Sequence, residues 1–145
     1  MSPLVIDASI AIKWVIEEEG TAEALLLRKK ARLRAPDLLA AECANILWKK
    51  AQRKELSAEE ALFAAGLLQA ADIELTPTRP LMAAATRIAI ELDHPAYDCV
   101  YLALAAESDC PFVTADDRLL RKLAQARRRK GLAKAISLAE AAAAK

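Results

Sequence analysis

The sequence predicts an α/β fold in which helices cover both faces of a parallel sheet. Short apolar runs alternate with longer helical stretches through almost the whole chain, which is typical of βαβ units. Alanine and leucine dominate and aromatic residues make up only 4%, so helix should outweigh strand. With 145 residues, 55% of them hydrophobic, the chain can bury a sizeable core, and we expect one domain over residues 1–145.

The first residues predict a strand followed by two helices. Residues 4–6 are apolar and end at Asp7, which is typical of a short buried strand. A helix should follow from Ser9, its expected N-cap, to about residue 18. A glycine then separates it from a second helix over residues 21–30.

The next stretch predicts a strand and a pair of helices. The run "RLRAP" indicates a strand that its proline ends. Asp37 can cap a helix from 38 to about 54. Ser57 and Glu60 form the S-x-x-E pattern of a capping box at the start of a helix over 57–70.

The remaining residues continue the alternation. "DIELTP" predicts a third strand, and a helix over about 80–92 follows it. "DHPAYDCVYLALAAES" predicts a turn and then an apolar helix with Pro95 near its start. "PFVTA" predicts a fourth strand, and the basic helix after it stops at Gly131. "KAISL" predicts a fifth strand before an alanine-rich final helix.

Charge and cysteine content exclude several classes of protein. The formal net charge is only +1, so bulk electrostatics selects no partner. Cys43, Cys99 and Cys110 form no CxxC pair, which indicates structural thiols in a reducing compartment. The N-terminus does not resemble a signal peptide, and no run of about 18 apolar residues is free of charge. We therefore expect a cytoplasmic protein with no membrane partner.

Acidic residues follow two of the predicted strands. Asp7 comes directly after the first strand, and Asp116 and Asp117 come just after the fourth. The carboxyl ends of parallel strands meet at one edge of a sheet, where ligands bind in open α/β folds. These side chains should therefore lie near one another.

Two more acidic residues lie on helices. Asp98 lies in the first turn of an otherwise apolar helix, where the helix dipole favours a negative charge. Glu42 lies one turn into its helix, on the same side as Asn45, while Ile46 and Leu47 turn toward the expected core. If Asp98 and Glu42 join the strand-end aspartates, four carboxylates converge.

Such a cluster needs protons or a cation to offset its charge. Two carboxylates about 4 Å apart repel by roughly 4 kcal/mol at an effective dielectric of 20. A hard divalent cation such as Mg²⁺ or Mn²⁺ prefers oxygen ligands and can activate water beside a phosphoryl group. Taken singly, each acid also has an ordinary interpretation: Asp7 and Asp116 as helix caps, Asp98 as a first-turn acid, and Glu42 and Asp117 as solvated side chains.

Other chemistries fit the sequence less well. His94 is the only histidine, which excludes a histidine pair, and its place in a proline-flanked turn disfavours a Ser-His-Asp triad. The cysteines lack the spacing of a zinc site, and no P-loop or GxGxxG motif occurs. Tyr97 and Tyr101 are better interpreted as packing residues than as a base-stacking platform.

Four stretches of the sequence stand out: LVIDASIAIKW, PDLLAAECANILWKK, HPAYDCVYLALAAE and FVTADDRLL. In order and spacing they resemble the motifs of PIN-domain proteins, and more closely those of the VapC toxins of bacterial type II toxin–antitoxin pairs, and the resemblance covers nearly the whole chain. It implies a three-layer α/β/α sandwich with a mainly parallel sheet of about five strands. It also implies a cytoplasmic, bacterial or archaeal Mg²⁺- or Mn²⁺-dependent endoribonuclease, a hydrolase whose metal-activated water leaves a 5′-phosphate and a 3′-hydroxyl.

The resemblance also implies a set of site residues. The expected catalytic and metal-binding residues are Asp7, Glu42, Asp98 and Asp116. The polar residues expected to position carboxylates or waters are Ser9, Asn45, Thr114 and Asp117. Asp117 could assist or replace Asp116 at the metal, but the T-x-D pattern favours Asp116, which leaves Asp117 to cap or flank the basic helix.

A basic surface should accompany this acidic site. Seven basic residues and no acid lie between positions 118 and 130, although a solvated helix face would look the same. RNA phosphates need positive charge beside the site. The expected RNA contacts are Arg118, Arg121, Lys122 and Lys49.

The resemblance further implies partners. These are a small cognate antitoxin that inhibits the toxin, a second toxin copy in a homodimer, and promoter DNA bound only through the antitoxin. The helices at 38–54 and 57–70 offer apolar surface for the antitoxin or the second copy. The usual RNA targets of the family are transfer RNA and ribosomal RNA.

Two alternatives to a toxin stay open at this point. One is a PIN-type nuclease with a housekeeping role in RNA processing, which a short antitoxin gene immediately upstream would argue against. The other is a non-catalytic PIN-like module whose acids bind a partner's arginine, against which the intact acid set counts.

Overall fold

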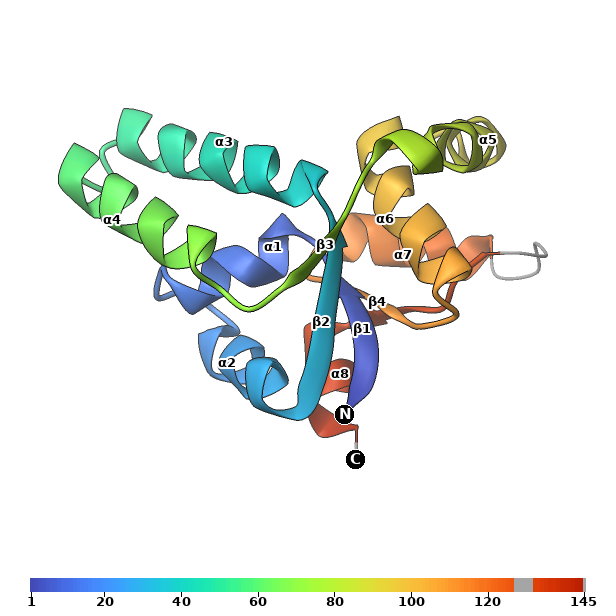
Figure 1. Ribbon diagram of the computed structural model, residues 1–145, viewed down its shortest axis with the longest axis horizontal. Coiled ribbons are helices and arrows are strands. Elements are labelled where there is room, and N and C mark those ends of the chain that lie inside the picture. Colours follow the sequence, from blue (N-terminus) through green and yellow to red (C-terminus); the bar gives the residue numbers. More distant parts are fainter. Residues whose placement is uncertain (127–131, 145) are drawn as a thin grey trace.

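A computed structural model describes residues 1–126 and 132–144 (Figure 1). Its strands are β1 (Ser2–Ile6), β2 (Ala31–Pro36), β3 (Glu74–Thr76), β4 (Phe112–Thr114) and β5 (Ala135–Ser137). Its α-helices are α1 (Ala8–Ala11), α2 (Thr21–Lys30), α3 (Leu38–Gln52), α4 (Ala58–Gln69), α5 (Met82–Leu92), α6 (Ala96–Glu107), α7 (Asp117–Gln125) and α8 (Leu138–Ala143). Two 3₁₀ turns, η1 (Ile12–Trp14) and η2 (Arg79–Leu81), precede α2 and α5.

The five strands form one sheet in the order β3-β2-β1-β4-β5, and every pairing is parallel. β1 is therefore the central strand. Val5 pairs with Phe112 and Ile6 with Val113, so continuing this register brings residue 7 beside residue 114. The apolar side chains of β1 and β4 explain this central position, because Val5, Ile6, Phe112 and Val113 have no exposed surface.

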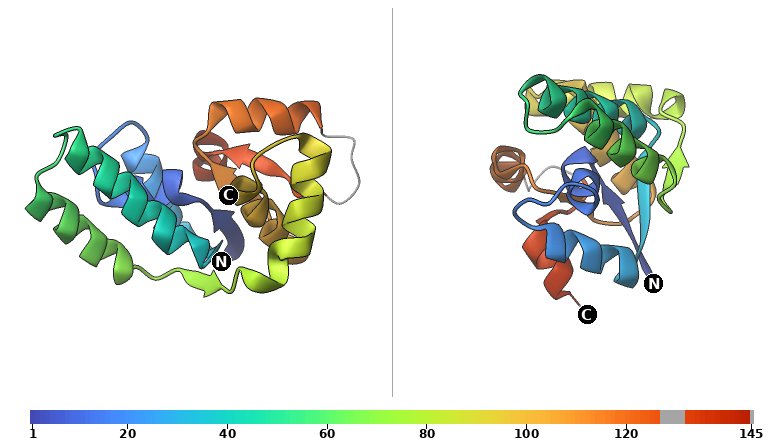
Figure 2. Two further views of the ribbon diagram at one scale, coloured as in Figure 1. Left: turned by 90° about the horizontal axis from the view of Figure 1, so that it is seen from above. Right: turned by 90° about the vertical axis from the view of Figure 1, so that its left-hand side faces the viewer.

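Helices cover both faces of the sheet, which confirms the predicted α/β/α arrangement. α6 packs against β1, β2 and β4, and α5 packs along α6. On the other face, α2 contacts β2 while α8 contacts β4 and β5 (Figure 2). The α3–α4 pair extends away from the sheet beyond β2 (Figure 1).

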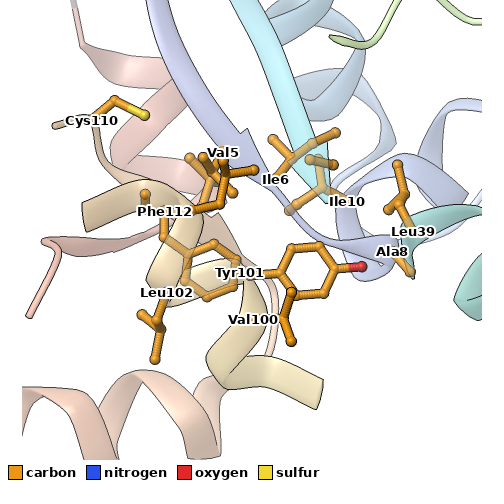
Figure 3. Packing of buried hydrophobic residues seen from close by; sticks show 14 of the residues in the cluster. Val5, Ile6, Ala8, Ile10, Leu39, Val100, Tyr101, Leu102, Cys110 and Phe112 are labelled. Atoms are coloured by element: carbon orange, nitrogen blue, oxygen red, sulfur yellow. The ribbon is translucent and has the colours of Figure 1, made fainter. Parts of the chain in front are cut away.

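A buried aromatic pair fixes α6 on the sheet. The rings of Tyr101 and Phe112 stack with their centroids 5.9 Å apart (Figure 3). Both side chains are fully buried, so this contact locks the helix that carries Asp98 against the strand that precedes Asp116. Cys43, Cys99 and Cys110 are buried as free thiols.

The first predicted helix is wrong in extent. Only Ala8–Ala11 is α-helical, a 3₁₀ turn follows, and Ser9 lies inside the helix instead of capping it. The chain turns after Trp14, and the indole Nε1 of Trp14 donates to the carbonyl of Ala24 at 2.9 Å, which ties the 3₁₀ turn to α2.

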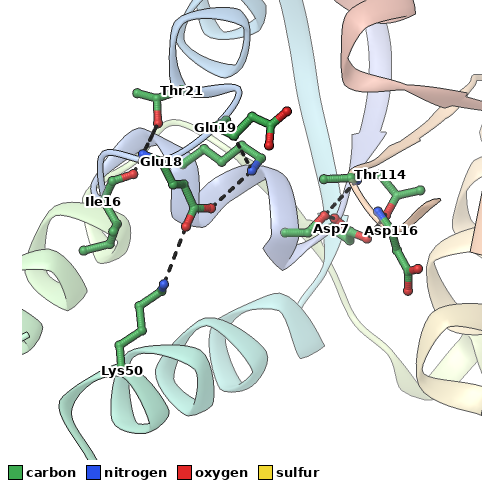
Figure 4. A network of polar contacts seen from close by, with 11 residues as sticks. Asp7, Ile16, Glu18, Glu19, Thr21, Lys50, Thr114 and Asp116 are labelled. Atoms are coloured by element: carbon green, nitrogen blue, oxygen red, sulfur yellow. Dashed lines mark hydrogen bonds and ion pairs between the residues drawn. The ribbon is translucent and has the colours of Figure 1, made fainter. Parts of the chain in front are cut away.

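Contacts of Glu18 hold the turn that follows. The backbone N–H of Glu18 donates to Thr21 Oγ1, and its carboxylate accepts a hydrogen bond from Lys13 and pairs with Lys50 of α3 (Figure 4). Lys50 thereby ties this turn to the helix that carries Glu42.

The other elements agree with the sequence to within a few residues. Ser57 and Glu60 form the predicted capping box. The predicted end of the basic helix, residues 127–130, and its stop at Gly131 lie outside the described residues. In the part of the chain that the structure covers, no helix is long and apolar enough to cross a lipid bilayer.

Candidate active site

Asp7 is the centre of the site, at the carboxyl end of the central strand. Its Oδ1 accepts a hydrogen bond from Ser9 Oγ at 2.5 Å, and its Oδ2 accepts one from Thr114 Oγ1 at 2.6 Å. Thr114 is completely buried and only 7% of Asp7 is exposed. Two hydroxyl groups therefore fix both oxygens of a carboxylate that the sheet register brings beside β4.

The same two hydroxyls hold the loop after β4. Ser9 Oγ accepts from the backbone N–H of Ala115 at 3.0 Å, and Thr114 Oγ1 accepts from that of Asp116 at 3.1 Å. Each hydroxyl thus accepts from the loop and donates to Asp7. This double use explains how Asp116 comes to lie next to Asp7 (Figure 4).

Asp116 is also the N-cap of α7. Its Oδ1 accepts from the N–H groups of Arg118 and Leu119, at 3.0 and 3.1 Å. Asp117 is the first residue of that helix and does not cap it, contrary to one of the roles expected for it. Asp117 lines a different hollow, which it shares with Lys13 and Ser137.

Glu42 and Asp98 line one cleft between α3 and α6. The cleft has a volume of about 460 Å³, within the range of small-ligand sites, and Asn45 and the half-buried Ile46 also line it. Tyr97 lines it as well and is 69% exposed, so the expectation that Tyr97 is a packing residue is wrong. Glu42 and Asp98 therefore share an open cleft beside the buried Asp7.

The three carboxylates of Asp7, Glu42 and Asp98 are close enough to influence one another. Burial, chiefly, and then the charge of Asp98 raise the pKa of Asp7 to about 6, although hydrogen bonds from Ser9 and Thr114 oppose the rise. Burial also raises the pKa of Glu42, and the charges of Asp98 and Asp7 add to this. A site in which acids resist losing their protons is one that favours a cation.

Tyr101 supports Glu42 from below the cleft. Its hydroxyl lowers the pKa of Glu42, while burial and the charge of Glu42 raise the pKa of the phenol itself. Neither Tyr101 Oη nor Glu42 Oε1 has a well-formed hydrogen bond, although both atoms are buried. Their interaction therefore falls short of full hydrogen-bond geometry. The only signal for it in the sequence is the spacing of Tyr101 and Asp98, which lie one helical turn apart.

His94 is a further member of the site that the sequence reasoning missed. Its Nε2 lies 2.6 Å from Asp98 Oδ2, and its Nδ1 lies 3.4 Å from Lys122 Nζ. The signal was present, since His94 and Asp98 are four residues apart across the predicted turn that begins the helix, a spacing at which side chains can meet.

The four basic residues predicted to contact RNA differ in how far their side chains are exposed. Arg118 and Arg121 are exposed on α7, and Lys49 is exposed on α3. Lys122 is partly buried, and its Nζ also donates to the carbonyl of Asp93 at 2.6 Å. The ammonium group of Lys122 thus has two contacts within the protein.

The candidate ligands are of the chemical type that a hard divalent cation prefers. They are all carboxylates. The nearby Cys43 thiol is not a competing ligand, because burial raises its pKa to about 12 and keeps it neutral. The buried Glu42 Oε1, without a well-formed partner, suits a cation or a water. Among residues 1–126 and 132–144, no three carboxylate, thiol or imidazole groups lie close enough to hold one ion as they stand, so binding requires the side chains to draw together.

Comparisons with known proteins agree with this architecture. The family model described as "PIN domain" matches residues 4–126. The crystal structure of PAE2754 from Pyrobaculum aerophilum is similar, with a TM-score of 0.70, 26% identity, and coverage of 99% of this chain and 97% of that one. VapBC2 from Rickettsia felis, bound to a DNA fragment from its promoter, gives a TM-score of 0.65 at 12% identity and covers 93% and 98%. No curated protein matches the chain.

Proposed function

The chain belongs to the PIN domain family, and from this premise we propose that it is a metal-dependent endoribonuclease acting as the toxin of a VapC-type toxin–antitoxin pair. One observation carries the proposal. Asp7 follows β1, Glu42 lies on α3 and Asp98 on α6, and burial, with a smaller contribution from the charge of Asp98, raises the pKa of both Asp7 and Glu42. If these acids served only as helix caps, they would not need to lie near one another beside an open cleft.

The proposed cofactor is Mg²⁺, with Mn²⁺ as an alternative. Asp7, Asp98, Glu42 and Asp116 are the residues that would hold it, because Asp7 and Asp116 follow the carboxyl ends of β1 and β4, and Glu42 and Asp98 line the neighbouring cleft. When bound, the cation would supply positive charge that makes a water more acidic and offsets charge on a phosphate.

The residues of the chain have separable tasks in this proposal. Ser9 and Thr114 hold Asp7 in one orientation through both of its oxygens. Glu42 has a raised pKa and a buried oxygen without a well-formed partner, which suits it to orient the attacking water and take its proton at Oε1. Asn45, on the same cleft wall, can hydrogen-bond the phosphate or this water.

The substrate we propose is RNA, held at the cleft by positive charge and by stacking. Arg118, Arg121 and Lys49 are exposed on the two helices, α7 and α3, that begin near the acids. Tyr97 exposes its ring at the cleft beside Asp98, where an unpaired base could stack on it. Transfer RNA and ribosomal RNA are the proposed targets.

We propose an antitoxin and a second toxin copy as the protein partners. The similar structure from Rickettsia felis is that of VapBC2 with a DNA fragment from its promoter, and we extend that assembly to this chain, with promoter DNA bound through the antitoxin. The apolar surface that supports a partner lies on α3 and α4, where Trp48, Leu62 and Phe63 are 56%, 74% and 70% exposed. An exposed patch of this kind is uncommon on a protein that works alone.

Cleavage of total cellular RNA by the purified, antitoxin-free protein tests the proposal. The reaction is run with Mg²⁺, with Mn²⁺ and with a chelator, beside the Asp98→Asn variant. We expect discrete fragments that require a cation and are lost in the variant. Folded protein that cleaves nothing with either cation would favour a non-catalytic binding module, and fragments that persist in both the chelator and the variant would indicate a contaminant.

A genetic experiment separates a toxin from a housekeeping nuclease. Induced expression of the wild-type chain should stop growth, and co-expression of a short gene from immediately upstream should restore it. The Asp98→Asn variant should be harmless at the same protein level. Normal growth on expression of an active wild-type nuclease would support the housekeeping role.

A further inference from the structure

The imidazole of His94 lies between a carboxylate and an ammonium group. Asp98 Oδ2 lies 2.6 Å from Nε2 on one side of the ring, and Lys122 Nζ lies 3.4 Å from Nδ1 on the other. The His94 side chain is only 15% exposed and that of Asp98 is 30% exposed. The three groups form a line that connects α7 to the first turn of α6.

The backbone around His94 fixes the position of the ring. Asp93 ends α5 in the left-handed conformation, with φ of 52°, and the N–H of His94 donates to the carbonyl of Ala89 at 3.1 Å. Pro95 is the N-cap of α6, and a proline restricts the backbone of the residue before it, which here is His94. Lys122 donates to the Asp93 carbonyl at 2.6 Å, so one ammonium group holds both the turn and the ring.

The chemistry of these partners selects one tautomer. A lysine ammonium group has three donors and no acceptor, so a favourable contact with Nδ1 requires a lone pair on that nitrogen. The remaining ring proton then lies on Nε2, which faces the acceptor Asp98 Oδ2. The ring can donate to Asp98 in this tautomer and not in the other.

We propose that His94 is a positioning residue that donates its Nε2 proton to Asp98, and that Lys122 acts on this histidine instead of on RNA by fixing its tautomer. The inference rests on the proposed role of Asp98 as a cation ligand. This bond uses only Oδ2 of Asp98, so Oδ1 stays available for a cation. Because the hydrogen bond already orients the carboxylate, Asp98 loses less freedom when a cation binds. Groups that hydrogen-bond metal ligands commonly act in this way.

The first test is the tautomer of His94 in the cation-free protein. The chain has one histidine, so long-range ¹H–¹⁵N spectra of ¹⁵N-histidine-labelled protein, recorded at mildly alkaline pH, contain signals from a single ring. We expect Nε2 to be protonated and Nδ1 unprotonated in the wild type. Lys122→Met should mix the tautomers, whereas Arg121→Met, which removes an exposed charge from the same helix, should not.

The second test is the affinity for Mn²⁺, measured by calorimetry without RNA. His94→Ala should weaken binding by roughly tenfold or more. His94→Gln, whose amide can still donate to Asp98, should recover most of that loss. Rescue of the Mn²⁺ affinity by glutamine shows that the donated hydrogen bond is required, and that the volume of the side chain is not the only contribution.

Several results would overturn this assignment. A wild-type ring protonated at Nδ1, or at both nitrogens, contradicts the tautomer, and this spectrum does not depend on any variant folding. Unchanged Mn²⁺ affinity in a folded His94→Ala protein contradicts the positioning role. If wild-type protein binds Mn²⁺ as described but cleaves no RNA, the proposed nuclease function fails while the assignment of His94 stands.

Discussion

At the scale of single residues, Asp7 has the most unusual environment in the site. It is almost fully buried, and each of its two oxygens accepts a bond from a neutral hydroxyl group. Two neutral donors do not replace the water that an ionised carboxylate loses on burial. The cation-free protein therefore carries a destabilising charge at its centre.

The stability of the cation-free protein should reflect this charge. Folding raises the pKa of Asp7 from 3.8 to about 6, so between roughly pH 4 and pH 6 the folded chain keeps a proton that the unfolded chain has lost. The contribution of Asp7 to stability is thus most favourable below pH 4 and declines by about 3 kcal/mol as the pH rises to 6.

The Asp7→Asn variant should therefore be inactive yet more stable. We expect its free energy of unfolding at pH 8 to exceed that of the wild type by about 1–3 kcal/mol, because the amide is neutral and a hydroxyl oxygen has a spare lone pair to accept its N–H. The gain should vanish toward pH 4. Urea unfolding of chelator-treated protein measures it, with the exposed Asp72→Asn as the control. A variant less stable than wild type at pH 8 would contradict this account.

The Tyr101→Phe variant tests the contact beneath Glu42. Since the hydroxyl lowers the pKa of Glu42, its removal should raise that pKa and shift the acid limb of the pH–rate profile to higher pH. Stability should change by less than about 1 kcal/mol, because the ring keeps its stacking on Phe112. Tyr97→Phe, at the other tyrosine of the chain, should leave the acid limb in place. An unshifted limb in Tyr101→Phe would restrict Tyr101 to packing.

At the scale of elements, the ends of strands and helices bring the site together. β1 ends directly before Asp7 and β4 ends at Thr114, and α6 and α7 carry Asp98 and the cap residue Asp116 at their starts. The sequence predicted these ends because an apolar run followed by an acid is a local pattern. The order of the strands and the placement of α6 depend on contacts between distant residues, such as Tyr101 with Phe112, and no local pattern encodes them.

The errors of the sequence reasoning have a common physical cause. Ser9 has the ordinary character of an N-cap, but its hydroxyl bonds Asp7 and the N–H of Ala115, more than 100 residues away along the chain. His94 was considered only as a member of a histidine pair, a triad or a zinc site, but its ring contacts Asp98 and also Lys122, 28 residues away along the chain. In both cases a side chain serves a tertiary contact that outweighs its local preference.

Asp116 caps α7 and is also proposed to hold the cation, and one pair of substitutions can separate these two roles. Asparagine caps a helix about as well as aspartate, whereas alanine costs about 1 kcal/mol. We therefore expect Asp116→Asn to keep the unfolding midpoint of the wild type and to lose cleavage, and Asp116→Ala to lose both. Thermal unfolding and RNA cleavage, measured on the same samples, give the comparison. A fully active Asp116→Asn protein would make Asp116 a cap alone.

At the scale of the whole molecule, the proposal requires exposed arginines to compensate for an acidic site that would repel RNA. Arg118→Met and Arg121→Met should each weaken RNA binding and reduce the slope of log affinity against log salt by about 0.7. Fluorescence anisotropy with a labelled single strand in chelator measures the slope. Arg32 is exposed near the amino end of β2, at the opposite edge of the sheet, so Arg32→Met should leave it unchanged. Equal slopes for all variants would place the RNA elsewhere.

The bond between Thr114 and Asp7 spans 107 residues, and this separation has a consequence for synthesis on the ribosome. At roughly 5–20 residues per second, Asp7 leaves the exit tunnel many seconds before Thr114 does. During that interval β1 has no β4 to pair with, and its aspartate has neither its buried hydroxyl donor nor the carboxylates of α6. The complete site can therefore form only after the residues of β4 have left the ribosome, several seconds after those of β1.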